Sequence, residues 1–179
     1  MGIFLSFLPW IAFWILSGRE SFAIAAAASA AVVFFITIRD IREHNIKVLD
    51  LGTLVFFVLL TVAAFTPWAK WIDRSALPLS NVALFLIALI SILIRKPFTL
   101  QYAREQVDPK FWDSPAFYST NLVISWVWCA TFAIVAVTSS LALNHPCLID
   151  RLIHILVFVG AIKFTSWYPD HVKEKMKNQ

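Results

Sequence analysis

Charged residues, glycine and cysteine are all scarce in this sequence of 179 residues. Only 15% of the residues are Asp, Glu, Lys or Arg, whereas soluble domains carry about 25%. The basic residues are scattered at the ends of apolar runs, which excludes a nucleic-acid-binding module despite an isoelectric point of 9.3. Two cysteines exclude a disulfide scaffold, and four isolated glycines exclude a glycine-rich phosphate loop.

The residue spacings of metal and catalytic sites are also missing. None of the four histidines, His44, His145, His154 and His171, has a second histidine three or four residues away. The paired-histidine pattern of membrane desaturases and hydroxylases is therefore absent, and no paired carboxylates suggest acid–base catalysis. We predict no catalytic residue, no metal and no cofactor, and we do not expect an enzyme.

Hydrophobic residues are what the sequence has in excess, at 60% of the chain and a mean hydropathy of +0.76. They form runs near the length of about 17 to 25 residues that a spanning helix needs. The predicted fold class is an all-α polytopic integral membrane protein, with one transmembrane domain over 1–179. Its six predicted helices cover about 2–17, 21–38, 48–68, 77–94, 115–143 and 152–168.

Local signals support some of these helices. Ser114 is a predicted N-cap, and Pro115 suits the first helical position. The first run contains Trp10 and Trp14 and lacks a basic segment before it, so it is interpreted as a helix rather than a cleaved signal. The alanine-rich stretch 23–31 allows close helix approach, so the second helix is expected at the centre of the bundle.

Lysine and arginine are distributed unequally between the two predicted sides. One side holds ten of them: Arg39, Arg42, Lys47, Arg95, Lys96, Arg104, Lys110, Lys173, Lys175 and Lys177. The opposite side holds four: Arg19, Lys70, Arg74 and Arg151. Because cytoplasmic connections are enriched in basic residues, both termini are predicted to be cytoplasmic.

Few ionisable residues fall inside the predicted helices, and each one is expensive in hydrocarbon. Asp50 lies one turn into the third helix, where pairing with Arg42 or Lys47 or simple solvation at the interface is expected, with transport or proton transfer as the less favoured alternative.

Charged residues also extend the second helix. There, Arg39 with Glu43, and Asp40 with His44, have the i,i+4 spacing of exposed helical pairs.

The connection over 95–114 interleaves aromatic residues with charges of both signs. Its part over 98–107 is predicted to lie on the membrane surface, with Phe98, Leu100 and Tyr102 facing lipid and Arg104 facing headgroup phosphates. It is either a docking or lipid-contact site on the cytoplasmic face or an anchor that sets helix depth. The candidate contact residues are Arg95, Lys96, Pro97, Gln101, Tyr102, Arg104, Glu105, Trp112, Asn121, Arg39 and Arg42.

Three short motifs resemble the bacterial intracellular septation protein A family. They are the opening 4–9, which reads FLSFLP, the pair Lys96 and Pro97 followed by Gln101, and the set Trp112, Asn121 and Trp126. The resemblance implies a small inner-membrane protein with a scaffold or interaction role in envelope maintenance and septation. Its implied partners are cell-division or wall-synthesis membrane proteins, besides the lipid bilayer.

Other functions stay open at this point. A small transporter or channel, working as a homo-oligomer such as a dimer, is the main alternative, although transporters usually have broken helices and polar groups at mid-membrane. A membrane enzyme that acts on lipid through 95–113 is a third hypothesis. A homo-oligomer is compatible with each of these functions.

Overall fold

A computed structural model describes residues 3–17, 21–43, 45–143 and 148–177. Within these ranges all regular structure is helical, which confirms the all-α fold class. The elements are α1 (Phe4–Leu16), α2 (Phe22–Arg42), α3 (Val48–Ala63), α4 (Ala69–Arg74), α5 (Ala76–Leu93), α6 (Phe98–Ala103), the 3-10 helix η1 (Pro109–Phe111), α7 (Pro115–Leu141) and α8 (Leu148–Lys177).

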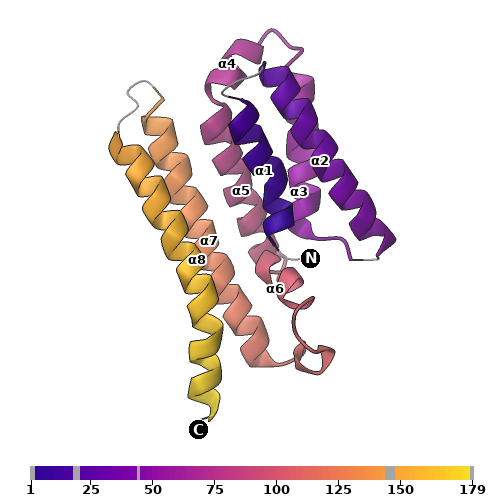
Figure 1. Cartoon of the computed structure of the whole chain (residues 1–179), viewed down its shortest axis with the longest axis vertical. Coiled ribbons are helices and arrows are strands. Elements are labelled where there is room, and N and C mark those ends of the chain that lie inside the picture. Colours follow the sequence, from indigo (N-terminus) through magenta and orange to yellow (C-terminus); the bar gives the residue numbers. More distant parts are fainter. Residues whose placement is uncertain (1–2, 18–20, 44, 144–147, 178–179) are drawn as a thin grey trace.

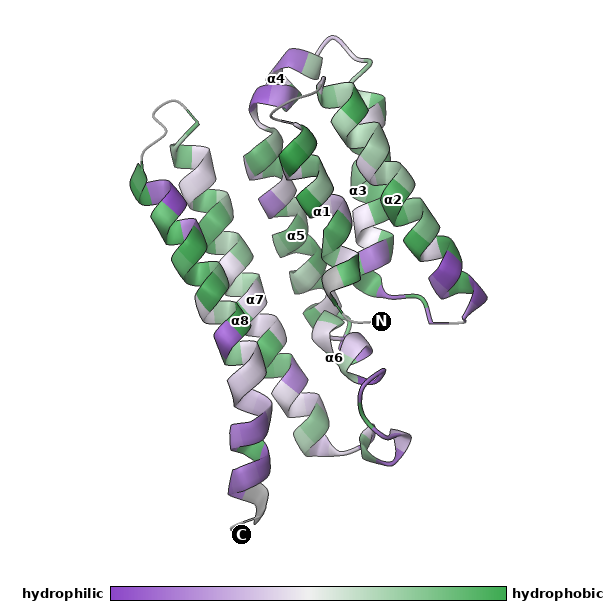
Figure 2. Cartoon of the chain, in the orientation of Figure 1, coloured by the Kyte–Doolittle hydropathy of each residue, from purple (hydrophilic) through white to green (hydrophobic). Residues whose placement is uncertain are grey.

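The long helices α1, α2, α3, α5, α7 and α8 run in alternating directions (Figure 1). The short helix α4 joins α3 to α5 at one end of the bundle, called the α4 end, while α6 and η1 join α5 to α7 at the α6 end. Helices α1, α2 and α3 pack together, α5 links α3 to α7, and α8 packs on α7. Figure 2 shows apolar helix bodies between more polar ends.

Three of the described helices, α2, α5 and α7, are long and apolar enough to cross a membrane. Helices α1 and α3 are apolar but shorter, and many large apolar side chains face outward, such as Phe35, Leu59 and Leu156. Water-soluble monomers rarely expose so much contiguous apolar surface. The chain therefore has the helices and the outer surface of a membrane protein.

The ends of the helices differ from the sequence prediction at three places. Helix α3 ends at Ala63 instead of position 68, because Pro67 has no N–H to continue the helix; the Thr66 hydroxyl bonds to the Ala63 carbonyl oxygen at 2.7 Å. Helices α2 and α8 are longer than predicted, and α8 continues through Pro169. The start of α7 is as predicted, since the Phe117 N–H donates to the Ser114 hydroxyl oxygen at 3.2 Å.

Helix α2 lies at the edge of the bundle (Figure 1), so its predicted central position is wrong. Its small residues Ala25 and Ala26 are fully buried and do allow close packing, but only one face of the helix is covered. Phe34 and Phe35 are exposed on α2. A close approach between α3 and α5 occurs at Gly52, where a Cβ atom would lie 2.7 Å from the Ile87 side chain.

Aromatic rings fill the core between α1 and α3. Trp10, Phe13 and Phe57 are fully buried, and the Phe57 ring centroid lies 4.9 Å from that of Trp10 and 5.3 Å from that of Phe13. The Trp10 indole N–H donates to the Thr53 hydroxyl oxygen at 3.1 Å, which satisfies the polar atom of a buried ring. This core supports the candidate site from the α4 side.

Candidate functional site

The chain turns sharply between α5 and α6. Arg95 has φ of 58°, in the left-handed region, and the Lys96 N–H donates to the Ser91 carbonyl oxygen at 2.9 Å. The Phe98 N–H then donates to the Ser91 hydroxyl oxygen at 3.1 Å. These bonds satisfy backbone groups at the end of α5 and direct α6 inward, with Pro97 buried at the turn.

Helix α6 is buried in the bundle, so its predicted position on the membrane surface is wrong. Phe98, Leu100 and Tyr102 are 0%, 5% and 3% exposed. The Thr99 hydroxyl donates to the Asn121 carbonyl oxygen at 2.8 Å and lies 2.8 Å from the Ser125 hydroxyl oxygen on α7. Van der Waals packing of three large side chains against the neighbouring helices stabilises this position, and the bonds to α7 satisfy the polar groups that become buried with them.

Gln101 connects α6 to two other helices. Its side-chain oxygen accepts the Val48 N–H at 2.8 Å, and its amide nitrogen donates to the Lys96 carbonyl oxygen at 3.1 Å. Lys47, the N-cap residue of α3, makes no capping bond with its own side chain. The start of α3 is therefore capped by a side chain 53 residues further along the chain.

Seven residues form a charged junction where α1, α2, α3 and α6 meet: Ser6, Arg39, Asp40, Lys47, Asp50, Tyr102 and Glu105. At its centre the Lys47 ammonium is 3.0 Å from Asp40 Oδ2 and 2.9 Å from Glu105 Oε1. It also lies 5.4 Å from the centroid of the Tyr102 ring. The Lys47 side chain is only 2% exposed, so these interactions are largely shielded from water.

Asp50 occupies the inner side of the junction. Its Oδ2 accepts the Tyr102 hydroxyl at 3.3 Å, and the same hydroxyl lies 2.8 Å from the Ser6 hydroxyl oxygen. The predicted ion pair of Asp50 with Arg42 or Lys47 is wrong, because Lys47 turns toward Asp40 and Glu105 instead. Asp50 Oδ1 is buried and accepts no hydrogen bond from the described residues.

Asp40 points inward rather than along the surface of α2. Arg39 lies 3.1 Å from Asp40 Oδ1, and Lys47 holds the other oxygen. The predicted i,i+4 pair of Arg39 with Glu43 is confirmed at 3.6 Å. The second predicted pair cannot be compared in the same way, since His44 lies outside the described residues.

The junction shifts the pKa values of its groups outside the spanning helices. Burial alone lowers the pKa of Lys47, but bonds to Glu105 and Asp40 outweigh burial and hold it above the usual 10.5. Burial likewise raises the pKa of Glu105, but Lys47 outweighs it and holds the value below the usual 4.5. Burial and the Asp50 carboxyl raise the pKa of Tyr102, which keeps its phenol a neutral donor.

A second group of candidate residues lies on the outer surface of the α6 end. The Arg104 guanidinium lies 5.4 Å from the centroid of the Trp112 ring, and the Trp112 indole N–H donates to the Val107 carbonyl oxygen at 3.0 Å. Beside them is a mainly apolar cavity of about 670 Å³ between the 103–114 segment, α7 and α8. Residues lining this cavity include Val107, Phe111, Phe117, Asn121, Val172 and Lys173.

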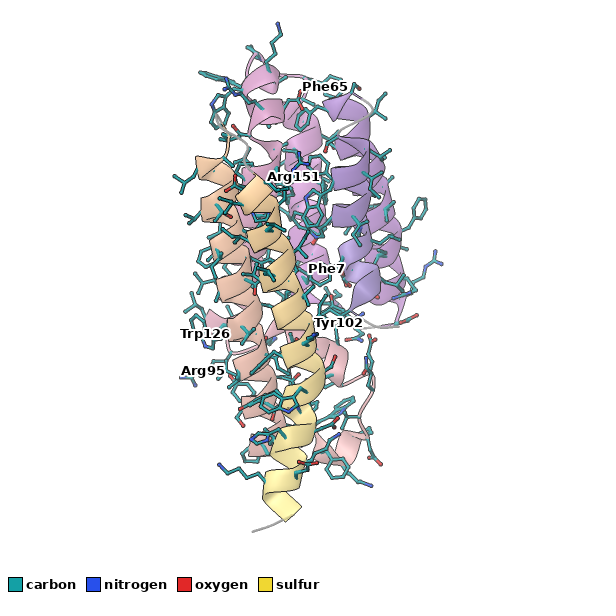
Figure 3. All side chains as sticks on the ribbon, turned by 60° about the vertical axis from the view of Figure 1, so that its left-hand side comes forward. Phe7, Phe65, Arg95, Tyr102, Trp126 and Arg151 are labelled. Atoms are coloured by element: carbon teal, nitrogen blue, oxygen red, sulfur yellow. The ribbon has the colours of Figure 1, made fainter. Side chains whose placement is uncertain are left out.

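The structure brings together only part of the predicted set. Arg39, Gln101, Tyr102 and Glu105 meet around the junction, and Asn121 holds α6 through its carbonyl oxygen. Arg42, Arg95 and Lys96 are exposed outside it. Figure 3 shows Phe65 near the top of the molecule, Arg151 below it, and Tyr102 and Arg95 below the middle.

Sequence reasoning missed Asp40, Lys47 and Ser6 as members of a site. One signal was available: Lys47 stands between Ile46 and Val48, three residues before Asp50. A lysine flanked by apolar residues beside a membrane helix indicates a buried partner.

The chain matches no protein-family model, no curated protein and no solved structure.

Proposed function

We propose that the chain crosses a bacterial inner membrane six times, with both termini in the cytoplasm. The alternating directions of the six long helices support this topology (Figure 1), as does the excess of lysine and arginine toward the α6 end. Helices α1 and α3 have 13 and 16 residues, which is about 20 and 24 Å at 1.5 Å per residue. They are shorter than the hydrocarbon core, so local thinning of the bilayer accompanies their crossing.

Labelling of single cysteines tests this topology. In a variant with Cys129 and Cys147 replaced by alanine, Lys70→Cys at the α4 end and Lys110→Cys at the α6 end are introduced separately. A membrane-impermeant maleimide added to whole cells should label the cysteine at position 70 and leave the one at position 110 unlabelled until the membrane is permeabilised. The reverse pattern, or equal labelling of both, would contradict the proposed orientation.

The proposed function is a scaffold or interaction role in envelope maintenance and septation, as the resemblance to the intracellular septation protein A family implies. One observation supports it: the segment 104–112 after α6 is held to the bundle by an ion pair on its inner side and has exposed side chains on its outer side. Glu105 binds the buried Lys47, while Lys110 and Phe111 point outward beside the cavity. A surface held in one conformation loses little entropy on binding.

The expected partners are cell-division or wall-synthesis membrane proteins. A cavity with an exposed aromatic residue beside it is suited to receive an apolar side chain of a partner, since aromatic and apolar side chains dominate interface energies. Phe111 is 50% exposed, whereas Tyr102 is buried and unsuited to direct contact. The surface available for a partner therefore consists of residues 104–112 and the cavity. Tyr102 is not part of this surface and instead forms hydrogen bonds inside the junction.

Photo-crosslinking in living cells tests this role. A light-activated amino acid replaces Phe111, and the matched control replaces Trp71, an exposed aromatic residue of α4 at the opposite end. Cross-links from position 111 to a division or wall-synthesis protein, absent from position 71, are the expected result. Identical products from both positions, or lipid alone at position 111, would remove the support for a scaffold.

A small transporter or channel is a second candidate, because Asp40, Lys47 and Asp50 are buried at the ends of apolar helices. The fully buried rings of Trp10, Phe13 and Phe57 close the bundle between this site and the α4 end. Cysteines placed at Thr53 and Leu60 of α3 distinguish the two functions. Labelling at both buried positions from water would favour a solute pathway, and protection at both would favour the scaffold.

A further inference from the structure

The buried part of the charged junction has one more acid than base. Asp40 and Asp50 are each 1% exposed, and Lys47 is 2% exposed. Both oxygens of Asp40 have a cationic partner, Arg39 at 3.1 Å and Lys47 at 3.0 Å. Asp50, in contrast, has as hydrogen-bond donors only the neutral hydroxyls of Tyr102, at 3.3 Å, and of Ser6, and no cation of the described residues pairs with it. A buried carboxylate without a cation is strongly unfavourable.

The two carboxyl groups also face each other. Asp40 and Asp50 lie within hydrogen-bonding distance of one another. As a carboxylate, Asp50 leaves its Oδ1 buried without a donor. Two carboxylates that share one site cannot both be ionised without strong repulsion, whereas one proton between them gives a hydrogen bond. A single proton on Asp50 Oδ1 therefore removes both the repulsion between the two carboxylates and the unpaired buried oxygen.

We infer that Asp50 is a proton-binding site, in which the protonated carboxyl of Asp50 donates a hydrogen bond to the ionised carboxyl of Asp40. The groups that face this site are Ser6 from α1, Arg39 from α2, Lys47 before α3, and Tyr102 and Glu105 from α6 and the segment after it. The site is independent of whether the α6 end binds a partner.

The ligand is a proton rather than a metal ion. The Lys47 ammonium and the Arg39 guanidinium already contact the two oxygens of Asp40, so a metal ion there would lie close to two positive charges and would still need several oxygen ligands. No group of three or more metal-ligating side chains occurs among the described residues. A proton needs only the two carboxyl groups that are present.

The junction reaches water at the α6 end and is closed toward the α4 end. From Asp40, ion pairs lead to Arg39, which is 34% exposed, and through Lys47 to Glu105, which is 20% exposed, so the junction reaches water at the α6 end. In the other direction, Thr53 and Trp10 are hydrogen-bonded to each other, and Phe57 covers them. These closely packed groups separate Asp50 from the α4 end.

Infrared spectroscopy of the full chain in lipid nanodiscs tests the site, because the carbonyl stretch of a carboxylic acid is separate from that of a carboxylate. Labelling aspartate with ¹³C at the carboxyl assigns the band. At neutral pH we expect one protonated aspartate band, lost in Asp50→Asn and unchanged in Asp73→Asn, which alters an exposed aspartate of α4. Absence of the band, or its persistence in Asp50→Asn, would overturn the assignment.

Two further measurements complete the test. Asp40→Asn removes the carboxylate that faces Asp50, so the band of Asp50 should shift to higher frequency where Asp50 stays protonated or disappear where it ionises beside Lys47, and this readout serves if Asp50→Asn does not fold. An unshifted band in Asp40→Asn would show that the proton is not donated to Asp40 and would overturn the inference. The wild-type band should be the same in sodium and choline chloride at one pH, whereas its loss in sodium would identify a sodium site instead.

Discussion

The charged junction and the last turns of α8 carry the same chemistry in opposite surroundings. In the junction, Lys47 pairs with Asp40 at 3.0 Å, and the two side chains are 2% and 1% exposed. Near the end of α8, Lys173 pairs with Asp170 at 3.3 Å, with exposures of 68% and 73%. An exposed pair contributes about 0–1 kcal/mol, whereas breaking a buried pair from one side costs about 3–5 kcal/mol. The two pairs therefore differ in their contribution to stability because of burial, and not because of their N–O distances, which are similar.

The two regions also differ in how they form. The pair on α8 is made by residues three apart on one helix, and the helix alone brings them together. The junction requires α2, α3 and α6 to meet, since Lys47 and Glu105 are 58 residues apart in the chain. Its loss should therefore loosen the contacts of α6 with α2 and α3, while loss of the pair on α8 should change little else.

The largest expected effect follows from Lys47→Met. Methionine fills similar space but leaves Asp40 and Glu105 without their shared cation, so the free energy of unfolding should fall by about 3–5 kcal/mol. Unfolding in mixed micelles, followed by tryptophan fluorescence, measures it. Lys70→Met on the exposed α4 is the matched control and should stay within about 0.5 kcal/mol of the wild type. Equal effects of the two substitutions would erase the contrast between buried and exposed lysines.

Extremes of pH should weaken the junction from both directions. The pKa of Glu105 is below the usual 4.5 in the folded chain, so its contribution is complete above pH 4.5 and is lost as the pH falls through the folded value. The pKa of Lys47 is above 10.5, so its contribution is complete below pH 10.5 and is lost as the pH rises through the folded value. Between these limits the contributions of Glu105 and Lys47 to the melting temperature should stay constant.

The variant Glu105→Gln sharpens the pH prediction. It should show a smaller acid-side decrease in melting temperature than the wild type, because the glutamine side chain does not titrate while the remaining acids still do. The same acid-to-amide change at Asp108, which forms an exposed pair with Lys110, is the control and should leave the acid side as in the wild type. An unchanged acid limb in Glu105→Gln would place the pH sensitivity outside the junction.

A smaller effect is expected for Gln101→Leu, which removes the acceptor of the Val48 N–H. By analogy with the loss of a helix N-cap, stability should fall by about 0.5–2 kcal/mol. Hydrogen exchange at the Val48 amide should accelerate, which separates loss of this bond from general loosening. Gln101→Glu keeps an acceptor oxygen and should restore protection, while Gln106→Leu, at an exposed position, should not alter exchange at Val48.

The sequence was sufficient for those features that depend on neighbouring residues. The apolar runs predicted the helices, and Ser114 with Pro115 predicted the start of α7. It was not sufficient for α6, because the alternating aromatic and charged residues of 98–107 suit a membrane surface equally well. The buried position depends on distant partners such as Asn121 and Ser125, which lie more than 20 residues away and bond Thr99.

The same distinction explains the site. Arg39 and Glu43 were paired correctly from their spacing, whereas Asp50 was assigned the wrong partner. The sequence shows that Lys47 is charged. It does not show that Glu105, from a distant segment of the chain, lies next to Lys47 and forms an ion pair with it. Long-range ion pairs of this kind have no local spacing, so counting charges along the chain could not separate the junction from the exposed pairs.

The smallest effect is expected on α8. Lys173→Ala removes a pair that water and salt already screen, so the free energy of unfolding should change by less than about 0.5 kcal/mol. Raising the salt concentration should abolish even that difference, while the effect of Lys47→Met should persist in the same buffer because buried pairs are screened much less. Unfolding of both variants at low and high salt measures this. A salt-resistant loss of stability in Lys173→Ala would mean that the end of α8 is held as firmly as the junction.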